Sequence, residues 1–140
     1  MLIRLLCCAC LTICLLAEDW PQFLGPARNG SYSGKDLAVK WPSAGPPVLW
    51  KKDVGAGFSS PVVSQGKLLL FHRKDGKEVL ECLDAKTGAA VWIYESPTTY
   101  RDDFGFDEGP RSTPAIAGGR VFTFAGDLHW GLSAGLGLTL

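Results

Sequence analysis

The feature of this sequence that most restricts its fold is an internal repeat. The pattern SSPVVxxGKLxxF, which begins at Ser59, returns 53 positions later as STPAIxxGRVxxF, which begins at Ser112. A second echo pairs Trp50 with Trp92, 42 positions apart, and one insertion between Trp92 and Ser112 accounts for the difference. A unit of about 40 residues indicates stacked copies of one structural element, because such a unit does not bury its apolar faces alone.

Each unit has the pattern of short strands joined by tight turns. Turns are predicted at Gln65-Gly66, at Asp75-Gly76 and over residues 85–88, and Asp-Gly is typical of two-residue hairpins. The chain also has 17 glycines and 9 prolines, which suits a fold with many turns. The predicted strands are residues 48–50, 60–64, 67–72, 78–84 and 89–95. The last four predict one four-stranded antiparallel sheet.

The most specific motif is Asp-x-x-x-Gly-x-x-x-Trp, formed by Asp84, Gly88 and Trp92. We expect the Asp84 carboxylate to accept hydrogen bonds from the turn amides that follow it, and Gly88 to supply the positive φ that ends the turn. Trp92 then lies at the start of the last strand and presents a large flat ring that can stack on a neighbouring sheet. This spacing predicts a clamp between stacked units.

These residues resemble the quinoprotein-type (PQQ-like) β-propeller repeat of exported bacterial proteins, with its tryptophan-docking motif. The stretches DWPQFLGP from Asp19 and YRDDFGFDEGPRSTP from Tyr100 are also similar to this family, and the resemblance covers residues 18–124. Cys82 stands where the motif usually has alanine. The resemblance implies an all-β fold: a partial β-propeller of about one and a half four-stranded antiparallel blades that follows an N-terminal signal segment.

Four regions are predicted along the chain. Residues 1–17 have one positive charge and an apolar run, and two acids follow them, which is the layout of a secretory signal peptide, with a buried helix or short membrane anchor as alternatives. Residues 18–47 are an extended segment that pins Trp20 and Phe23 against the core, residues 48–124 hold the repeats, and residues 125–140 form an atypical tail that suggests a truncated or frameshifted product. Only Cys82 lies outside residues 1–17, and we expect it to be a small buried hydrophobic residue.

Charge and family together narrow the functional classes. The chain has 14 basic and 14 acidic residues, which argues against nucleic-acid binding because that needs a basic surface. The family resembled contains non-enzymatic scaffolds, including the periplasmic component of the outer-membrane protein assembly machinery. It also contains dehydrogenases that bind pyrroloquinoline quinone and calcium.

We expect a non-catalytic scaffold or binding role in the periplasm or cell envelope, or after secretion. Its partners would be proteins or further blades, with no cofactor and no membrane span in the mature chain. The alternative is the N-terminal part of a dehydrogenase.

Two candidate sites remain outside the motif. The charged insert over residues 98–111 is a candidate surface-binding loop through Arg101, Asp103 and Arg111, although internal pairs between arginines and carboxylates in a solvated loop explain it as well. His72 has no partner at the spacing of metal ligands, and we predict that it lies at the surface near the end of a strand.

Overall fold

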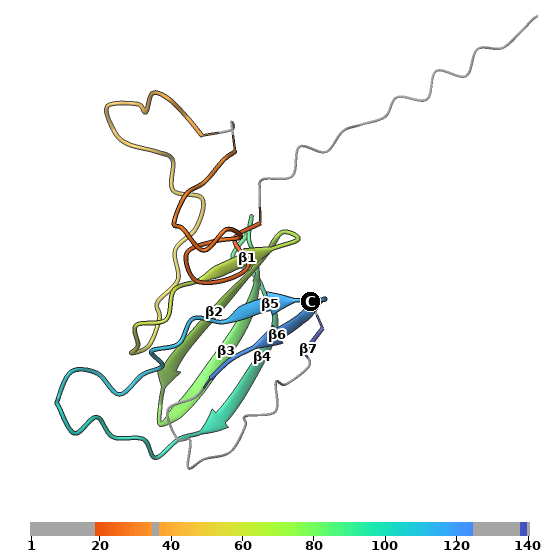
Figure 1. Ribbon diagram of the computed structural model, residues 1–140. Helices are drawn as coiled ribbons and strands as arrows, with labels where there is room; N and C mark the ends of the chain where they lie inside the picture. Colours follow the sequence, from red (N-terminus) through yellow and green to blue (C-terminus); the bar gives the residue numbers. More distant parts are fainter. Residues whose placement is uncertain (1–18, 35–36, 125–137, 140) are drawn as a thin grey trace, which may run out of the picture.

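The computed structural model describes residues 19–34, 37–124 and 138–139, and this part of the chain consists of strands, turns and extended segments (Figure 1). The strands form two antiparallel sheets with the orders β1-β2-β3-β4 and β5-β6-β7. The bounds are β1 (Val62–Ser64), β2 (Lys67–Lys74), β3 (Lys77–Asp84), β4 (Ala90–Pro97), β5 (Ala115–Ala117), β6 (Arg120–Phe122) and β7 (Leu138–Thr139). The all-β class and the four-stranded antiparallel sheet are therefore confirmed, whereas the propeller remains a prediction.

Tight turns set the register of the first sheet. Asp75 and Gly76 have φ values of 51° and 74°, and Gln65 and Gly66 have 51° and 73°. Two successive residues with positive φ form the type I′ turn, whose twist matches that of the flanking strands. The β2–β3 pairing consequently runs without a shift from Lys74↔Lys77 to Lys67↔Asp84. The predicted hairpin turns are confirmed.

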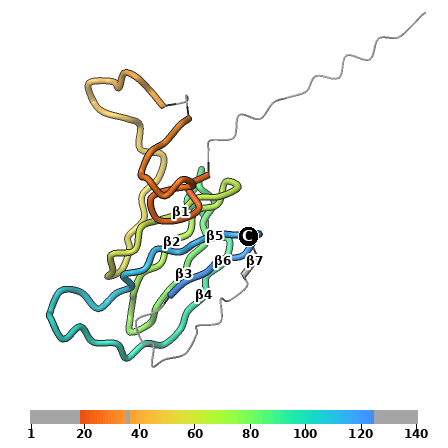
Figure 2. The backbone as a smooth tube through the Cα atoms, in the orientation of Figure 1, coloured from red at the N-terminus to blue at the C-terminus, as the bar shows by residue number. Residues whose placement is uncertain are grey.

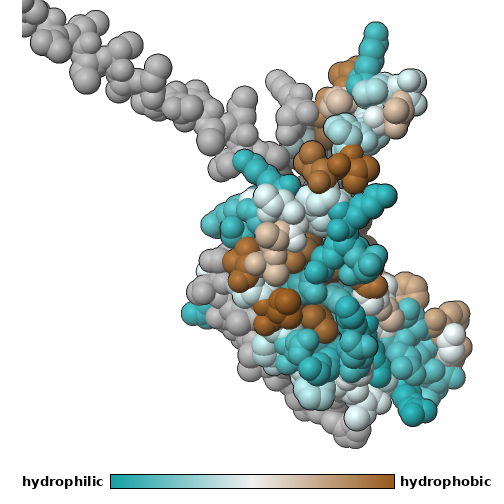
Figure 3. Space-filling view, turned by 180° about the vertical axis from the view of Figure 1, so that it is seen from behind, coloured by the Kyte–Doolittle hydropathy of each residue, from teal (hydrophilic) through white to brown (hydrophobic). Residues whose placement is uncertain are grey.

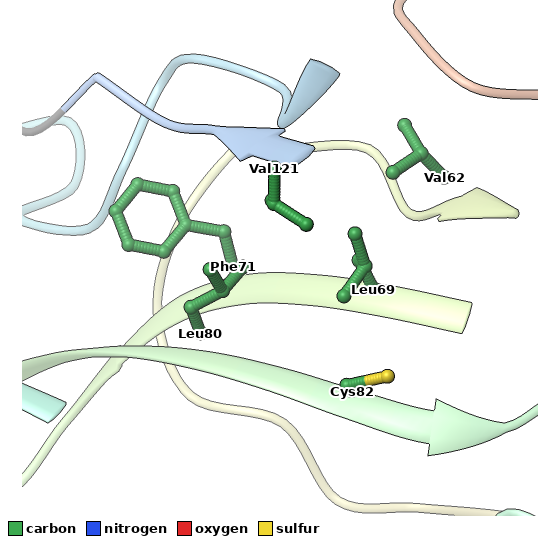
Figure 4. Close-up of a cluster of buried hydrophobic side chains, with 6 residues drawn as sticks. All are labelled: Val62, Leu69, Phe71, Leu80, Cys82 and Val121. Atoms are coloured by element: carbon green, nitrogen blue, oxygen red, sulfur yellow. The ribbon is translucent and has the colours of Figure 1, made fainter. Parts of the chain in front are cut away.

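The core lies between the two sheets. Successive side chains of a strand point to opposite faces, so β2 and β3 turn alternate residues towards the β5–β6 hairpin. The buried cluster consists of Val62, Leu69, Phe71, Leu80, Cys82 and Val121, the last reaching across from β6 (Figure 4). Burying each of the larger side chains stabilises the fold by about 1.5–3 kcal/mol. The predicted burial of Cys82 is confirmed, and this burial raises the pKa of its thiol.

The second sheet repeats the pairing of the first. Lys67 pairs with Asp84 in the first sheet, and the residue that corresponds to Lys67 in the repeat, Arg120, pairs with Thr139. Thr139 therefore occupies the place of Asp84, although the two sequences differ there. Residues 125–137 and 140, which hold most of the predicted atypical tail, lie outside the described residues, as does the predicted signal segment.

The predicted strand over residues 48–50 is wrong. These residues are extended but have no strand beside them, and a strand needs a partner for its backbone groups. The chain instead continues over residues 50–56, here called the strap, to a single bridge between Ala56 and Arg73. The strap contacts the sheet through Trp50, Lys52 and Gly55. Their partners include His72 and Glu81, which alternate with core residues, so the strap covers the face opposite the core.

The N-terminal segment joins the sheets at the end opposite the insert loop (Figure 2). Trp20 exchanges two backbone hydrogen bonds with Val63, of 2.8 and 2.9 Å. The prediction that Phe23 is pinned against the core is wrong, since its side chain is 60% exposed. The chain turns after Pro21 and brings Gly25, rather than Phe23, onto the Trp20 ring. No helix in the described ranges is long and apolar enough to cross a membrane.

Candidate functional site

The Asp84–Gly88 turn has the geometry that the motif predicted. Asp84 Oδ1 accepts hydrogen bonds from the backbone N–H of Lys86 (3.1 Å) and from the N–H and hydroxyl of Thr87 (both 2.9 Å). The Thr87 hydroxyl, followed by its N–H, holds the pKa of the Asp84 carboxyl below its usual range. Gly88 donates its N–H to the Asp84 carbonyl and has a φ of 71°. The predicted roles of Asp84 and Gly88 are confirmed.

The ring that lies on this turn belongs to Trp50. A Cβ atom added to Gly88 would lie 2.7–3.0 Å from three ring atoms of Trp50, so the indole rests directly on the glycine. Its Nε1 donates a hydrogen bond of 3.1 Å to the carbonyl of Ala85 in the same turn. The turn therefore receives the tryptophan of the strap both by packing and by a hydrogen bond. The echo between Trp50 and Trp92 was the sequence signal for this contact.

Trp92 on β4 corresponds to Trp50 in the repeat. Unlike Trp50, which belongs to the strap on the opposite face, Trp92 lies on the core face of the first sheet, paired with Cys82. It is partly buried and packs against the core cluster, on the side of the second sheet. Its Nε1 is buried and has no hydrogen-bond partner within the described part of the chain. A buried indole N–H normally has a partner, because leaving one unsatisfied costs about 1–3 kcal/mol. Trp92 thus packs on the core cluster, and its polar end is unused among the described residues.

A polar cluster under the strap was missed by sequence reasoning. His72 is only 3% exposed, so its predicted surface position is wrong. Its Nδ1 accepts a hydrogen bond of 2.9 Å from the Gly55 N–H, while Nε2 lies 3.5 Å from Glu81 Oε1. Lys52 Nζ lies 2.9 Å from the other oxygen of Glu81. Because Nδ1 accepts, the proton of a neutral imidazole is on Nε2, facing Glu81. The cluster attaches the strap through Nδ1, whereas Nε2 is buried and has no hydrogen-bond partner among the described residues.

The insert loop is organised by Asp102, the neighbour of the candidate surface-binding residue Asp103. Asp102 accepts hydrogen bonds from the N–H groups of Phe106 and Asp107 and pairs with Arg111 at 3.1 Å. Burial alone would raise the pKa of the Asp102 carboxyl, but these donors and the guanidinium outweigh it and lower that pKa. Arg101 and Asp103 are exposed. Arg111 is used internally, so the loop has the internal arginine–carboxylate pair that was the alternative to a binding site.

Arg73 fastens this loop to the sheet, a role that the sequence did not indicate. Its Nη1 donates to the carbonyl oxygens of Tyr100 (2.6 Å) and Glu108 (3.0 Å) and lies 3.3 Å from the Glu108 carboxylate. The Arg111 guanidinium also lies over the Phe58 ring, 5.4 Å from its centroid. Hydrogen bonds from a charged donor are stronger than neutral ones. The loop is thereby held at both ends.

The loop borders a shallow hollow of about 160 Å³, lined by Tyr100, Gly109, Pro110, Arg111, Ser112 and Phe124. Its polar donors include Arg111, which already pairs with Asp102. Across the ranges that the structure describes, no three His, Cys, Asp or Glu side chains lie close enough to hold a metal ion.

Comparison with known proteins found no match to any family profile, curated protein or solved structure.

Proposed function

We propose that this chain is a non-catalytic scaffold built from β-propeller-type repeats and exported to the periplasm or cell envelope. Its role is to stack antiparallel sheets so that further blades or protein partners dock on them. The proposal depends mainly on one observation: the Trp50 ring packs on the Asp84–Gly88 turn and donates a hydrogen bond to it. Trp92 is the residue that corresponds to Trp50 in the next repeat unit. On this proposal, Trp50 makes the docking contact of one unit, and Trp92 is the group that would make the contact of the next.

Equivalent residues of the two repeats also lie side by side. The Ser60 N–H donates a hydrogen bond of 3.2 Å to the hydroxyl of Thr113, its counterpart in the second repeat. The first strands of the two sheets, β1 and β5, are in contact. Adjacent units that touch through equivalent residues are typical of repeat architectures, whose stability comes from interfaces between neighbours. This supports an array of sheets more than an isolated sandwich.

A photocrosslinking experiment tests the scaffold role. A benzophenone amino acid at position 92 should cross-link to polypeptide in the cell envelope, because Trp92 is only partly covered by the core cluster and a docked blade or partner would cover the rest of its ring. The same residue at Val39, which is 95% exposed, is the control. Cross-linking at position 92 no greater than at position 39 would contradict a docking role for Trp92.

Titration separates the scaffold from the dehydrogenase alternative. Pyrroloquinoline quinone with calcium should give no saturable heat in calorimetry and no dye-linked oxidation of alcohols. Saturable binding with a dissociation constant near 1 μM, about −8 kcal/mol of binding free energy, together with such activity, would overturn the scaffold in favour of the enzyme. Export is tested separately, by the mass of the chain in the periplasmic fraction, which should lack residues 1 to about 17.

A further inference from the structure

The strap holds a buried histidine in one protonation state. The Gly55 N–H donates a hydrogen bond of 2.9 Å to His72 Nδ1, so this nitrogen carries no proton while the strap is in place. The approach is close, because a Cβ on Gly55 would lie 2.9 Å from Nδ1. A second proton on the imidazole would set two N–H groups against each other at this distance. His72 therefore becomes an imidazolium only where Gly55 has moved away.

The other nitrogen of the imidazole faces Glu81. Nε2 lies 3.5 Å from Glu81 Oε1 but is buried and forms no hydrogen bond with any described residue. With the strap in place, the positive charge beside the carboxylate comes from Lys52, whose Nζ lies 2.9 Å from Glu81 Oε2. His72 and Glu81 are only 3% and 7% exposed, and a buried carboxylate is costly unless an opposite charge pairs with it. An imidazolium at His72 would supply that charge in place of Lys52.

The other charged groups on this side of the sheet are exposed. In Figure 1 the second sheet lies in front of the first, so Figure 3, seen from behind, shows the side that the strap covers, where hydrophilic residues surround separate hydrophobic patches. Besides Glu81 and Lys52, the charged groups that face His72 from the strap, the sheet and the β2–β3 turn are Lys51, Asp53, Lys74, Asp75, Lys77 and Glu95. Lys77 and Glu95 pair with each other at 2.6 Å. Water and salt screen exposed charges, so the buried groups dominate the electrostatics at His72.

We propose that protonation of His72 releases residues 51–55 of the strap, so that the cluster is a pH-sensitive switch for the outer face of the first sheet. The imidazole takes one proton from solvent and loses the hydrogen bond from Gly55. The imidazolium then pairs with Glu81, and Lys52 leaves with the strap and keeps its own charge. The buried carboxylate is therefore paired in both states, which makes the open state accessible in a folded chain.

The release is local because both ends of the strap are attached independently. Trp50 Nε1 donates a hydrogen bond to the Ala85 carbonyl at one end. At the other end Ala56 exchanges two backbone hydrogen bonds with Arg73, of 2.8 and 2.9 Å. Neither attachment includes a group that titrates near neutral pH. Opening between them uncovers the cluster beside a surface hollow of about 250 Å³ that Glu81 helps to line.

The direction of the effect follows from the proton count. The open strap lets His72 bind one proton more than the closed strap does, so a fall in pH favours opening. A free imidazole titrates near pH 6.5. The strap is therefore held most firmly above about pH 6.5, and its opening should become about tenfold more frequent between about pH 7.5 and about pH 5.5.

Hydrogen exchange of two neighbouring amides tests the switch. In the full chain, the protection factor of the Gly55 N–H should fall about tenfold between about pH 7.5 and about pH 5.5. The Ala56 N–H, which bonds the Arg73 carbonyl at 2.9 Å, is the internal control and should change far less. An unchanged protection factor at Gly55, or an equal fall at both amides, would overturn the proposal.

Two variants and a ring measurement separate the proton from the contact. His72→Asn places an amide oxygen near the position of Nδ1, where it accepts a hydrogen bond without titrating, so protection of Gly55 should no longer depend on pH in this range. Glu81→Gln removes the partner of the imidazolium, so the fall should begin at a lower pH. Circular dichroism shows whether each variant is folded. In the native chain, the ¹⁵N shifts of the His72 ring should report the second proton over the same pH range as the loss of Gly55 protection. An equal fall in His72→Asn, or a protonated His72 with Gly55 still protected, would contradict the switch.

Discussion

Replacing Gly88 with alanine tests the docking contact directly. The added Cβ would lie 2.7 Å from Cδ2 of Trp50 and within 3.0 Å of two further ring atoms, and the φ of 71° disfavours any L side chain. The left-handed backbone conformation costs about 1–2 kcal/mol for a non-glycine residue. Overpacking a filled contact adds about 1–3 kcal/mol. We therefore expect Gly88→Ala to reduce the free energy of unfolding by about 2–5 kcal/mol.

The chain offers a matched control in Gly76. Its φ is 74°, but nothing lies within 4 Å of the Cβ that alanine would add. Gly76→Ala therefore pays the backbone cost alone, about 1–2 kcal/mol. The difference between the two variants isolates the contact with Trp50. In a Trp50→Ala background the extra cost of Gly88→Ala should disappear, because the ring that it meets is gone, and the resulting coupling free energy should be about 1–3 kcal/mol.

Urea unfolding followed by circular dichroism measures these differences. Sucrose in the buffer strengthens burial and keeps all variants within the measurable range. Tryptophan fluorescence gives a second probe, since agreement of the two transitions supports a two-state treatment. Equal destabilisation by Gly88→Ala and Gly76→Ala would refute the docking argument, as would an undiminished effect of Gly88→Ala in the Trp50→Ala background.

Three other properties can be checked. Arg73→Met should free the insert loop and speed tryptic cleavage at the exposed Arg101 about tenfold, because losing one charge-assisted hydrogen bond costs about 1.5 kcal/mol. The control Arg120→Met should leave the cleavage rate unchanged. The folded pKa of Asp102 is lowered, so its contribution is present above the usual carboxyl pKa of about 3.9 and is lost as pH falls through the folded value. The protection factor of the Phe106 amide, which corrects for the intrinsic pH dependence of exchange, should therefore fall in acid in the native chain but change far less in Asp102→Asn. Without residues 1–17, the chain should give a broad, weak thermal transition and bind a hydrophobic dye, because several apolar side chains remain exposed, and a sharp melt above about 50 °C would contradict this.

Local chemistry made the hairpins predictable. Asp75-Gly76 and Gln65-Gly66 specify turns with positive φ, and the apolar residues between them fill a four-stranded sheet. The repeat also indicated that a second unit packs on the first, since one sheet face cannot remain bare. The turn of Asp84 was predictable for the same reason, because an aspartate bonds amides two and three residues ahead whatever lies elsewhere in the chain.

The insert loop shows where local patterns stop being informative. Four acidic residues lie between positions 102 and 108, and their order in the sequence does not show which of them turns inward. Asp102 does so because the chain bends back and presents two N–H groups and Arg111 to it. Asp103, the next residue, points away and is exposed. Only the path of the backbone distinguishes Asp102 from Asp103. That path depends on the long-range hydrogen bonds that Arg73 donates to the loop.

His72 illustrates the same dependence on distant chain. Strand alternation places His72 and Glu81 on the face opposite Phe71, and polar residues on one face of a sheet normally indicate solvent. Here the strap covers that face and supplies the polar partners itself, the N–H of Gly55 and the ammonium of Lys52. The approach is so close that a Cβ on Gly55 would lie 1.9 Å from the Arg73 carbonyl oxygen. A histidine and a carboxylate on a sheet face are therefore compatible with burial when the covering segment carries a matching donor and a glycine, because a hydrogen bond and an opposite charge then offset part of the desolvation cost.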